Sequence, residues 1–342
     1  MHLGFWTWVR GQFFTQKPVV KTDLTGKTVI VLGANTGLGF EATKHFAKMK
    51  PERLILACRS QSRGQAAVDK LKAATGYTKA ELWIVDLADF ESVKQFATKF
   101  DRDGGRLDIL VENAAIGTFK YAPTKEGWES SLQVNSLSTS LVALLLLPAM
   151  IKTAQQHSTV PRLVVVSSEV HYWVKIEKRV YENPDMLKTL GSAEYCTDKA
   201  MRTRYQLTKL LNVFFVRALN ARLTPSTPLI VNTVNPGLCD SELRREISGI
   251  QAVLASLVVS VLAFTAEEGS RQLVWAAVAE QNQPEKLRGE FISACKVTEV
   301  ADFVLSPEGV KAENQLWDEL VDILGKLDPR VTENVEKYLS TI

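Results

Sequence analysis

The chain has 342 residues, of which 46% are hydrophobic and 23% are charged. This composition is ordinary for a globular protein with a sizeable core, and it excludes disordered, fibrous and collagen-like classes. The 41 basic and 38 acidic residues are interspersed and leave a formal net charge of +3. No basic block therefore predicts nucleic acid as a partner.

The four cysteines lie far apart in the sequence, and the chain has only four histidines. This spacing contains no Cys-x-x-Cys pair and no other metal-ligand pattern. We therefore expect reduced thiols in a cytoplasmic protein, and no metal site.

The first residues, MHLGFWTWVRGQFF, are apolar and aromatic. They lack a small-residue cleavage site and are too short to span a bilayer, so they predict neither a signal peptide nor a membrane helix. We treat residues 1–20 as an extension that rests on a membrane surface as a peripheral contact or, alternatively, folds back onto the protein. Residues 21–342 contain no repeat or linker-like tract and predict one domain.

Short apolar runs alternate with segments of helix length along the rest of the chain. The runs are rich in Val, Ile and Leu without polar alternation, as strands buried on both faces of a parallel sheet require. We expect an α/β fold with a doubly wound parallel sheet and helices on both faces. The expected strands lie at 27–33, 53–59, 80–87, 107–115, 162–168 and 229–237, and the clearest helices at 39–50, 62–76 and 89–100.

Two further apolar stretches, 141–150 and 250–264, could be taken for membrane spans. Both are shorter than the roughly 18 to 20 residues that a spanning helix needs. We expect them to form core or interfacial helices.

A glycine-rich turn follows the first expected strand, in VIVLGANTGLGFEA. Such a turn at the opening of a helix presents free backbone N–H groups and the positive helix end to a pyrophosphate. We expect Gly33 to permit the tight turn, Gly37 the close approach of a phosphate, and Gly39 the contact between helix and strand. The alternative is a turn with a purely structural role.

The second expected strand ends in LILACRSQSRG. An acid at this position accepts a hydrogen bond from a ribose 2′-hydroxyl, whereas arginine suits a 2′-phosphate. With Arg59 at the tip, Arg63 nearby and no acid between them, the sequence favours NADP(H) over NAD(H). The alternative for Arg59 is a solvated surface side chain.

The stretch EYCTDKAMRTRYQLTK contains two Tyr-x-x-x-Lys pairs, Tyr195 with Lys199 and Tyr205 with Lys209. A phenol has a pKa near 10 and is a poor acid or base at neutral pH unless a nearby cation favours its anion. A lysine one helical turn away supplies that cation, so either tyrosine could exchange a proton with a carbonyl oxygen.

The surroundings of the two tyrosines differ. Tyr205 opens a long stretch with apolar positions at helical spacing, whereas Tyr195 lies in a polar, less periodic stretch suited to a loop. Rigid elements hold catalytic geometry better than loops do. The sequence therefore predicts Tyr205 and Lys209 as the catalytic pair, with Tyr195 as a loop residue near the substrate entrance.

The Gly-x-x-x-Gly-x-Gly spacing, the later Tyr-x-x-x-Lys pair and the Pro236-Gly237 turn, in this order, resemble the classical short-chain dehydrogenases/reductases. The resemblance extends from about residue 21 to the C-terminal helices. It implies a Rossmann-type fold and hydride transfer between NADP(H) and a small lipophilic ketone, aldehyde or alcohol. Four residues depart from the family pattern, namely Leu32 for a threonine, Glu112 for an asparagine, Ala115 for a glycine and Thr208 for a serine.

The resemblance also implies roles for individual residues. Tyr205 would act as general acid and base, Lys209 would lower its pKa and bind the nicotinamide ribose, and Ser168 would polarise the carbonyl group. Asn135 would complete a proton path through water and the lysine. Ser167, which precedes the catalytic serine, is expected to secure the turn.

The resemblance also implies a set of cofactor contacts, in which Asp86 contacts the adenine. The expected cofactor-binding residues are Gly33, Asn35, Thr36, Gly37, Leu38, Gly39, Arg59, Asp86, Leu87, Asn113, Ala114, Tyr205, Lys209, Pro236, Gly237 and Leu238.

Within the family, the long insert at 169–204 and the stretches NPGLCDSEL, TAEEGSRQLVWAA and GEFISACK look most like the retinol-dehydrogenase-like reductases. The insert and the apolar segment 250–264 are expected to frame a hydrophobic substrate pocket, although a retinoid does not follow from fold and cofactor. Family members often form homodimers through the helices that carry Asn135 and Tyr205.

Two other functions stay open at this stage. One is a dinucleotide-binding scaffold or redox sensor without turnover. The other is epimerase or dehydratase chemistry on nucleotide sugars, which is associated with a different glycine spacing.

Overall fold

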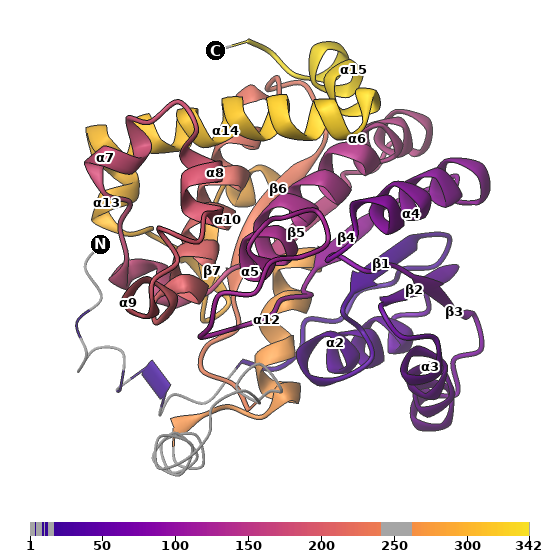
Figure 1. Ribbon diagram of the computed structural model, residues 1–342. Coiled ribbons are helices and arrows are strands. Elements are labelled where there is room, and N and C mark those ends of the chain that lie inside the picture. Colours follow the sequence, from indigo (N-terminus) through magenta and orange to yellow (C-terminus); the bar gives the residue numbers. More distant parts are fainter. Residues whose placement is uncertain (1–3, 5–8, 10, 13–16, 241–261, 342) are drawn as a thin grey trace.

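A twisted sheet runs through the centre of the molecule (Figure 1). The computed structural model describes residues 4, 9, 11–12, 17–240 and 262–341. The strand order is β3-β2-β1-β4-β5-β6-β7-β8, in which β1 to β7 are parallel and β8 is antiparallel to β7. The strands are β1 Thr28–Leu32, β2 Arg53–Cys58, β3 Ala80–Ile84, β4 Ile109–Glu112, β5 Arg162–Val166, β6 Ile230–Asn235, β7 Phe291–Ser293 and β8 Lys296–Thr298.

The order of the strands reverses at the centre of the sheet. The chain passes from β1 outward to β2 and β3, then returns to place β4 on the other side of β1. Such a reversal leaves a crevice at the carboxyl ends of the central strands, where ligands bind in open α/β sheets. The predicted doubly wound parallel sheet is confirmed, and only the short edge strands β7 and β8 lack a counterpart among the expected strands.

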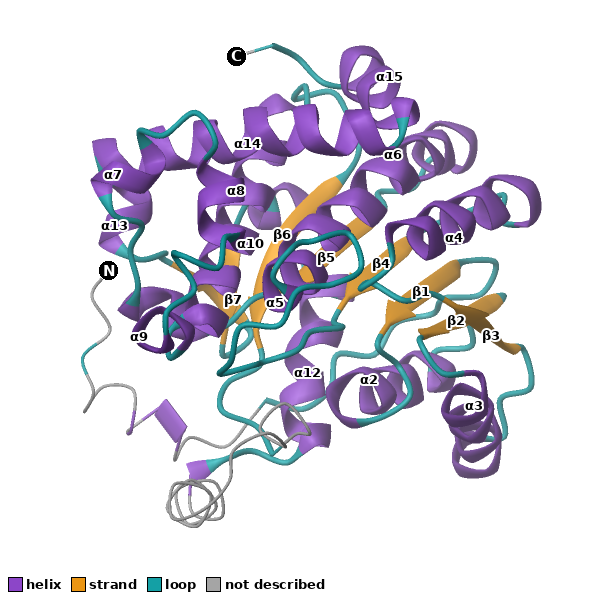
Figure 2. Ribbon diagram, in the orientation of Figure 1, coloured by secondary structure: helices purple, strands orange, loops and turns teal. Residues whose placement is uncertain are grey.

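Helices cover both faces of the sheet (Figure 2). Helices α2, α3 and α12 share one buried apolar cluster with the sheet, and α4, α6 and α10 share the other. The main helices are α2 Gly37–Lys48, α3 Gln61–Thr75, α4 Phe90–Asp103, α5 Ser130–Leu132, the π-helical turn η1 Gln133–Leu137, α6 Ser138–His157, α10 Arg204–Arg222, α12 Ala266–Val278, α14 Pro307–Leu327 and α15 Pro329–Tyr338. The short ones are the 3₁₀ turns η2 Glu169–Trp173 and η4 Pro284–Leu287, with α7 Lys178–Tyr181, α8 Met186–Gly191, α9 Asp198–Met201 and α13 Asp302–Leu305.

The C-terminal helices α14 and α15 lie across α10 and α6 (Figure 1). Phe215 of α10 stacks on Trp317 of α14 with ring centroids 6.4 Å apart. Asn334 of α15 donates a hydrogen bond of 3.0 Å from Nδ2 to the carbonyl oxygen of Leu144 in α6. The outer sides of α6 and α10 are therefore covered by the chain's own C-terminus.

The insert between β5 and α10 folds into η2 and the short helices α7, α8 and α9. Two main-chain N–H groups at the start of α8, those of Met186 and Leu187, donate to the carboxylate of Glu319 in α14 at 2.7 and 2.8 Å. The carboxylate caps the short helix, because its first N–H groups have no partner within the helix. The insert is thereby fixed to the C-terminal helices.

The apolar stretch at 141–150 lies in α6 and forms part of the core. Within the described residues, only the helical stretch Ser130–His157 is long and apolar enough to cross a membrane, and 89% of its most apolar window is buried inside the protein. The expectations for residues 1–18 and 250–264 fall largely outside the described residues.

Candidate active site

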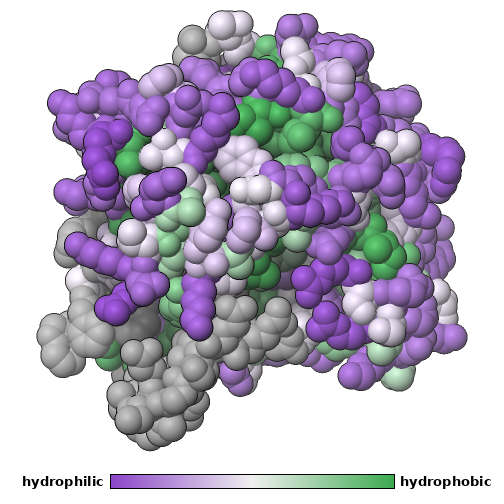
Figure 3. Space-filling model, in the orientation of Figure 1, coloured by the Kyte–Doolittle hydropathy of each residue, from purple (hydrophilic) through white to green (hydrophobic). Residues whose placement is uncertain are grey.

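A cavity of about 510 Å³ opens at the carboxyl ends of the central strands. Its volume is in the usual range for a small-molecule or cofactor site. Residues from the turns after β1, β2, β4 and β5 line it, together with the start of α10. On the face shown in Figure 3, recessed areas of hydrophobic surface are surrounded by hydrophilic side chains.

The glycine turn between β1 and α2 forms one wall of the cavity. Gly33 has a φ of +71°, and a Cβ atom there would lie 2.8 Å from the Cα of Ala114. A Cβ on Gly39 would lie 2.3 Å from the carbonyl oxygen of Gly33. A Cβ on Gly37 would meet no protein atom within 4 Å. Close packing therefore requires glycine at positions 33 and 39. Gly37 instead leaves open space at the N-terminus of α2, which suits a phosphate.

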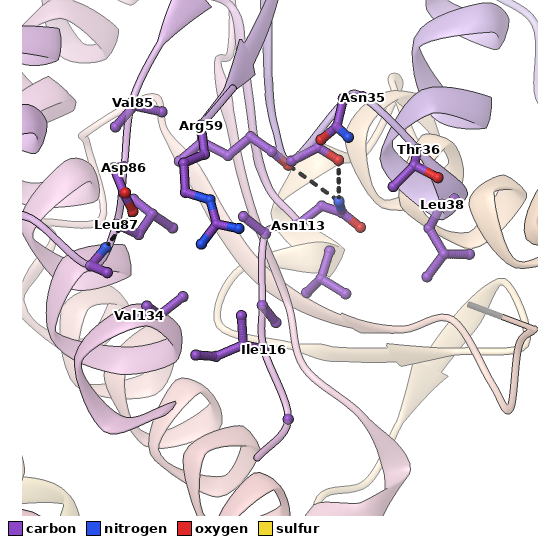
Figure 4. Close-up of a pocket in the computed structure, with 18 of the residues that line it drawn as sticks. Asn35, Thr36, Leu38, Arg59, Val85, Asp86, Leu87, Asn113, Ile116 and Val134 are labelled. Carbon is purple, nitrogen blue, oxygen red and sulfur yellow. Dashed lines mark hydrogen bonds between the residues drawn. The ribbon is translucent and has the colours of Figure 1, made fainter. Parts of the chain in front are cut away.

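Asn113, at the end of β4, holds this turn in place. Its Nδ2 donates to the carbonyl oxygens of Leu32 and Gly33 at 3.2 and 3.1 Å (Figure 4). Its neighbour Glu112 is 3% exposed, and neither carboxyl oxygen has a hydrogen-bond partner among the described residues. Burial raises the pKa of Glu112 well above its usual value. Burial without a partner therefore favours the neutral form of the glutamate that stands in place of asparagine.

Arg59 and Arg63 border the cavity at the end of β2. Both side chains are exposed, and neither has an ion-pair partner in the part of the chain that the structure describes. The guanidinium group of Arg59 points into the space between Asp86 and Asn113 (Figure 4). Two cations without carboxylate partners suit a phosphate group, since guanidinium and phosphate form charge-assisted hydrogen bonds.

Lys209 is buried below the cavity beside Tyr205. Its Nζ donates a hydrogen bond of 2.7 Å to the carbonyl oxygen of Val166 at the end of β5. The same nitrogen lies 5.4 Å from the centroid of the Tyr205 ring. Burial lowers the pKa of Lys209 to about 7. Any negative charge placed near it, a phenolate included, would favour the ammonium form.

Asn135 lies in the π-helical turn η1 that leads into α6. Its amide exchanges two hydrogen bonds with the main chain of Ile116, from Nδ2 to the carbonyl oxygen at 2.7 Å and from the N–H group to Oδ1 at 2.8 Å. Nδ2 also donates to Oγ1 of Thr208 at 3.1 Å, and that hydroxyl donates to the carbonyl oxygen of Tyr205 at 2.8 Å. Asn135 therefore joins the segment after β4 to the start of α10.

The two serines after β5 have different partners. Ser167 lines the cavity, but its hydroxyl is buried and donates to the carbonyl oxygen of Lys209 at 2.8 Å. Ser168 is only half-buried, and its Oγ accepts a long hydrogen bond of 3.4 Å from the N–H group of Val170. Within the described residues the Ser168 hydroxyl donates no hydrogen bond. Ser167 thus ties β5 to α10, while Ser168 keeps its hydrogen available.

Tyr195 lies between α8 and α9 and is not among the cavity-lining residues. Its ring centroid is 5.9 Å from the guanidinium carbon of Arg204, whereas Lys199 is exposed. Arg204 is buried, with Nη2 donating to the carbonyl oxygen of Leu190 at 2.6 Å and Nε lying 3.3 Å from a carboxylate oxygen of the buried Glu129. Tyr195 therefore packs the insert against Arg204.

Comparison with known proteins identifies the family. Residues 27–181 match the family model of the short chain dehydrogenases. The chain is 35% identical over 327 residues to the short chain dehydrogenase/reductase dmxR8 of Cryptosporiopsis sp. (strain 8999), covering 94% of this chain and 98% of that one. The protein belongs to the short-chain dehydrogenase/reductase family. It is also 35% identical over 331 residues to the short-chain dehydrogenase anuD of Penicillium roqueforti, covering 94% and 83% of the two chains.

Solved structures of short-chain dehydrogenases share the fold. A short chain dehydrogenase from Escherichia coli in complex with NADPH has a TM-score of 0.59 and 21% identity, covering 80% of this chain and 99% of that one. Salutaridine reductase from Papaver somniferum has a TM-score of 0.57 and 22% identity, covering 78% and 99%.

Most cofactor contacts expected for this short-chain dehydrogenase line the cavity. The exceptions are Gly39, which packs beneath it, and Gly237 and Leu238, which lie in the turn after β6. Of the expected catalytic residues, Tyr205 and Lys209 line the cavity, while Asn135 and Ser168 lie outside its wall. Sequence reasoning missed the apolar wall formed by the segment after β4 and by η1, because small and aliphatic side chains have no chemical signature. This wall includes Ala115, Ile116, Ala122 and Val134.

Proposed function

We propose that this short-chain dehydrogenase is an NADP(H)-dependent oxidoreductase that interconverts a lipophilic ketone or aldehyde and its alcohol. The observation that carries the proposal is the buried Lys209 amino group below Tyr205, at the cavity that the glycine turn and Arg59 also line. A cation in this position serves the ionisation of a phenol. A site that only binds a dinucleotide has no need of it.

The residues around the cavity suit NADP(H), which supplies the hydride when bound. The glycine turn and the N-terminus of α2 would hold the pyrophosphate, Arg59 and Arg63 the 2′-phosphate, and Asp86 the adenine. The turn at Pro236, which lines the cavity, would lie against the nicotinamide. The NADPH complex of a structural relative agrees with this choice of cofactor.

The catalytic residues would handle the proton at the carbonyl oxygen. In the reductive direction the Tyr205 hydroxyl donates its proton to that oxygen, and the Lys209 ammonium stabilises the phenolate left behind. The Ser168 hydroxyl donates a hydrogen bond to the same oxygen and stabilises the developing negative charge. Asn135, which contacts the start of α10 through Thr208, completes the path that returns a proton to Tyr205.

A hydrophobic substrate is favoured by the wall after β4. Ala115, Ile116 and Val134 border the cavity there without a charged neighbour between them. The similarity to retinol-dehydrogenase-like reductases, the cytoplasmic location and the membrane contact of residues 1–18 remain predictions from the sequence.

The alternative is a dinucleotide-binding scaffold or redox sensor without turnover. It requires the cofactor cavity but not the catalytic set. Four positions suited to proton transfer, Asn135, Ser168, Tyr205 and Lys209, favour the enzyme.

The Tyr-x-x-x-Lys pair is tested by comparing Tyr205→Phe with Tyr195→Phe. We expect Tyr205→Phe to reduce kcat by about 10²- to 10⁴-fold, because it removes the general acid. Tyr195→Phe should change kcat little, because its ring only packs on Arg204. The measurement is NADPH oxidation with a panel of lipophilic ketones and aldehydes. Loss of turnover in Tyr195→Phe alone would refute the assignment, and NADPH binding without any turnover would favour the scaffold.

Cofactor preference is tested with Arg59→Ala. We expect the Kd for NADPH to rise about tenfold to a hundredfold, since a hydrogen bond to a charged group contributes about 1.5–3 kcal/mol. The Kd for NADH, which lacks the 2′-phosphate, should stay nearly constant. Arg179→Ala, which removes an exposed arginine of α7, is the control for net charge. Equal weakening of both cofactors would contradict the role of Arg59.

The position of the C-terminal helices bears on one possible dimer interface. We propose that the chain does not dimerise through α6 and α10, because α14 and α15 cover their outer sides. Cross-linking with mass spectrometry at micromolar concentration should give no link between α6 or α10 of two copies of the chain. A link between these helices of two copies would contradict the proposal.

A further inference from the structure

The peptide group that joins Ser168 to Glu169 is held at both of its polar atoms by buried side chains. The carbonyl oxygen of Ser168 lies 2.8 Å from Nδ1 of His171. The N–H group of Glu169 donates to Oδ1 of Asn235 at 3.1 Å. One peptide plane is therefore fixed from two sides, by a residue of η2 and by the last residue of β6.

His171 has one possible tautomer in this arrangement. The N–H group of Ala301 donates to Nε2 of His171 at 3.3 Å, so Nε2 is the acceptor and the ring proton is on Nδ1. The side chain is fully buried, and burial lowers the pKa of His171 to about 4. The imidazole is thus neutral at physiological pH, and Nδ1–H donates to the Ser168 carbonyl oxygen.

Aromatic packing fixes the orientation of this ring. The His171 centroid lies 4.1 Å from that of Tyr172 and 4.6 Å from that of Phe291, the latter in an edge-on arrangement. The hydroxyl of Tyr172 donates to the carbonyl oxygen of Glu299, two residues before the Ala301 contact. The imidazole therefore connects the serine peptide to the segment between β8 and α13.

Asn235 connects the same peptide to the turn after β6. Its Oδ1 also accepts a hydrogen bond of 3.0 Å from the N–H group of Gly237. Its Nδ2 donates to a carboxylate oxygen of Glu169 and to Oγ of Ser293, both at 3.1 Å. Because Asn235 is buried and uses both ends of its amide, it has a fixed position between the Ser168 peptide and the Pro236-Gly237 turn.

We propose that His171 and Asn235 are positioning residues that orient the Ser168–Glu169 peptide and thereby aim the Ser168 hydroxyl at the substrate carbonyl. The inference rests on the proposed function, in which that hydroxyl contacts the substrate. Ser168 has φ −164° and ψ 154°, so its ψ is set by the peptide that the two side chains hold. A rotation of this peptide would move the loop that carries Oγ, and a displacement of about 1 Å can reduce a catalytic rate about a hundredfold.

The test uses His171→Phe, which keeps an aromatic ring of similar size but removes the side-chain donor to Ser168 and leaves only the main-chain N–H group of residue 171 at 3.3 Å. The matched variant is His171→Asn, whose amide keeps a donor near the position of Nδ1. Each is combined with Ser168→Ala. We expect His171→Phe to reduce kcat about 10- to 100-fold while the Kd for NADPH changes little. The melting temperature should fall, because the buried N–H group of Ala301 loses its acceptor. His171→Asn should restore kcat to within about fivefold of the unaltered protein, since the hydrogen bond is retained.

The double variant decides whether His171 acts through the serine. In the Ser168→Ala background, His171→Phe should cost little further activity, because residues that act as a unit are not additive. Equal losses in both backgrounds would overturn the proposal, as would unchanged kcat in His171→Phe. If His171→Phe does not fold, Asn235→Ala provides the same double-variant test. Unchanged kcat in Ser168→Ala alone would instead refute the proposed role of the serine.

Discussion

The hydrogen bond between Lys209 Nζ and the carbonyl oxygen of Val166 is the interaction on which the candidate site depends. It holds the buried amino group of Lys209 at the carboxyl end of β5, where desolvation lowers the pKa of that group. Ser167 strengthens the same junction by donating to the carbonyl oxygen of Lys209. These two contacts fix α10 against the sheet, so that Tyr205, one helical turn before Lys209, lies at the cavity.

Other parts of the chain are arranged around this junction. Asn135 and Thr208 connect the start of α10 to the segment after β4. Asn113, at the beginning of that segment, holds the glycine turn. His171 and Asn235 connect the serine loop to the C-terminal segment and to the turn after β6. The same main-chain contacts thus hold both the cofactor-binding turns and the proton-transfer residues. This explains how the carboxyl edge of one sheet can position groups from distant parts of the sequence.

The sequence predicted the parallel sheet because its central strands are buried on both faces and carry continuous apolar runs. It also distinguished Tyr205 from Tyr195, since only the former opens a periodic helix; the structure places only Tyr205 at the cavity wall. The contacts that hold the serine loop could not be predicted. His171 and Asn235 bind main-chain atoms, and such contacts depend on tertiary structure rather than on a spacing. The cover of α6 and α10 by α14 and α15 is likewise a matter of packing between distant segments.

A crystal structure with NADP⁺ bound would test the central claim most directly. The account predicts the 2′-phosphate in contact with Arg59 and the pyrophosphate at the glycine turn. It also predicts the nicotinamide beside the hydroxyl of Tyr205, with Lys209 Nζ donating a hydrogen bond to the ribose. A nicotinamide bound away from Tyr205, or a 2′-phosphate without a contact to Arg59 or Arg63, would contradict it.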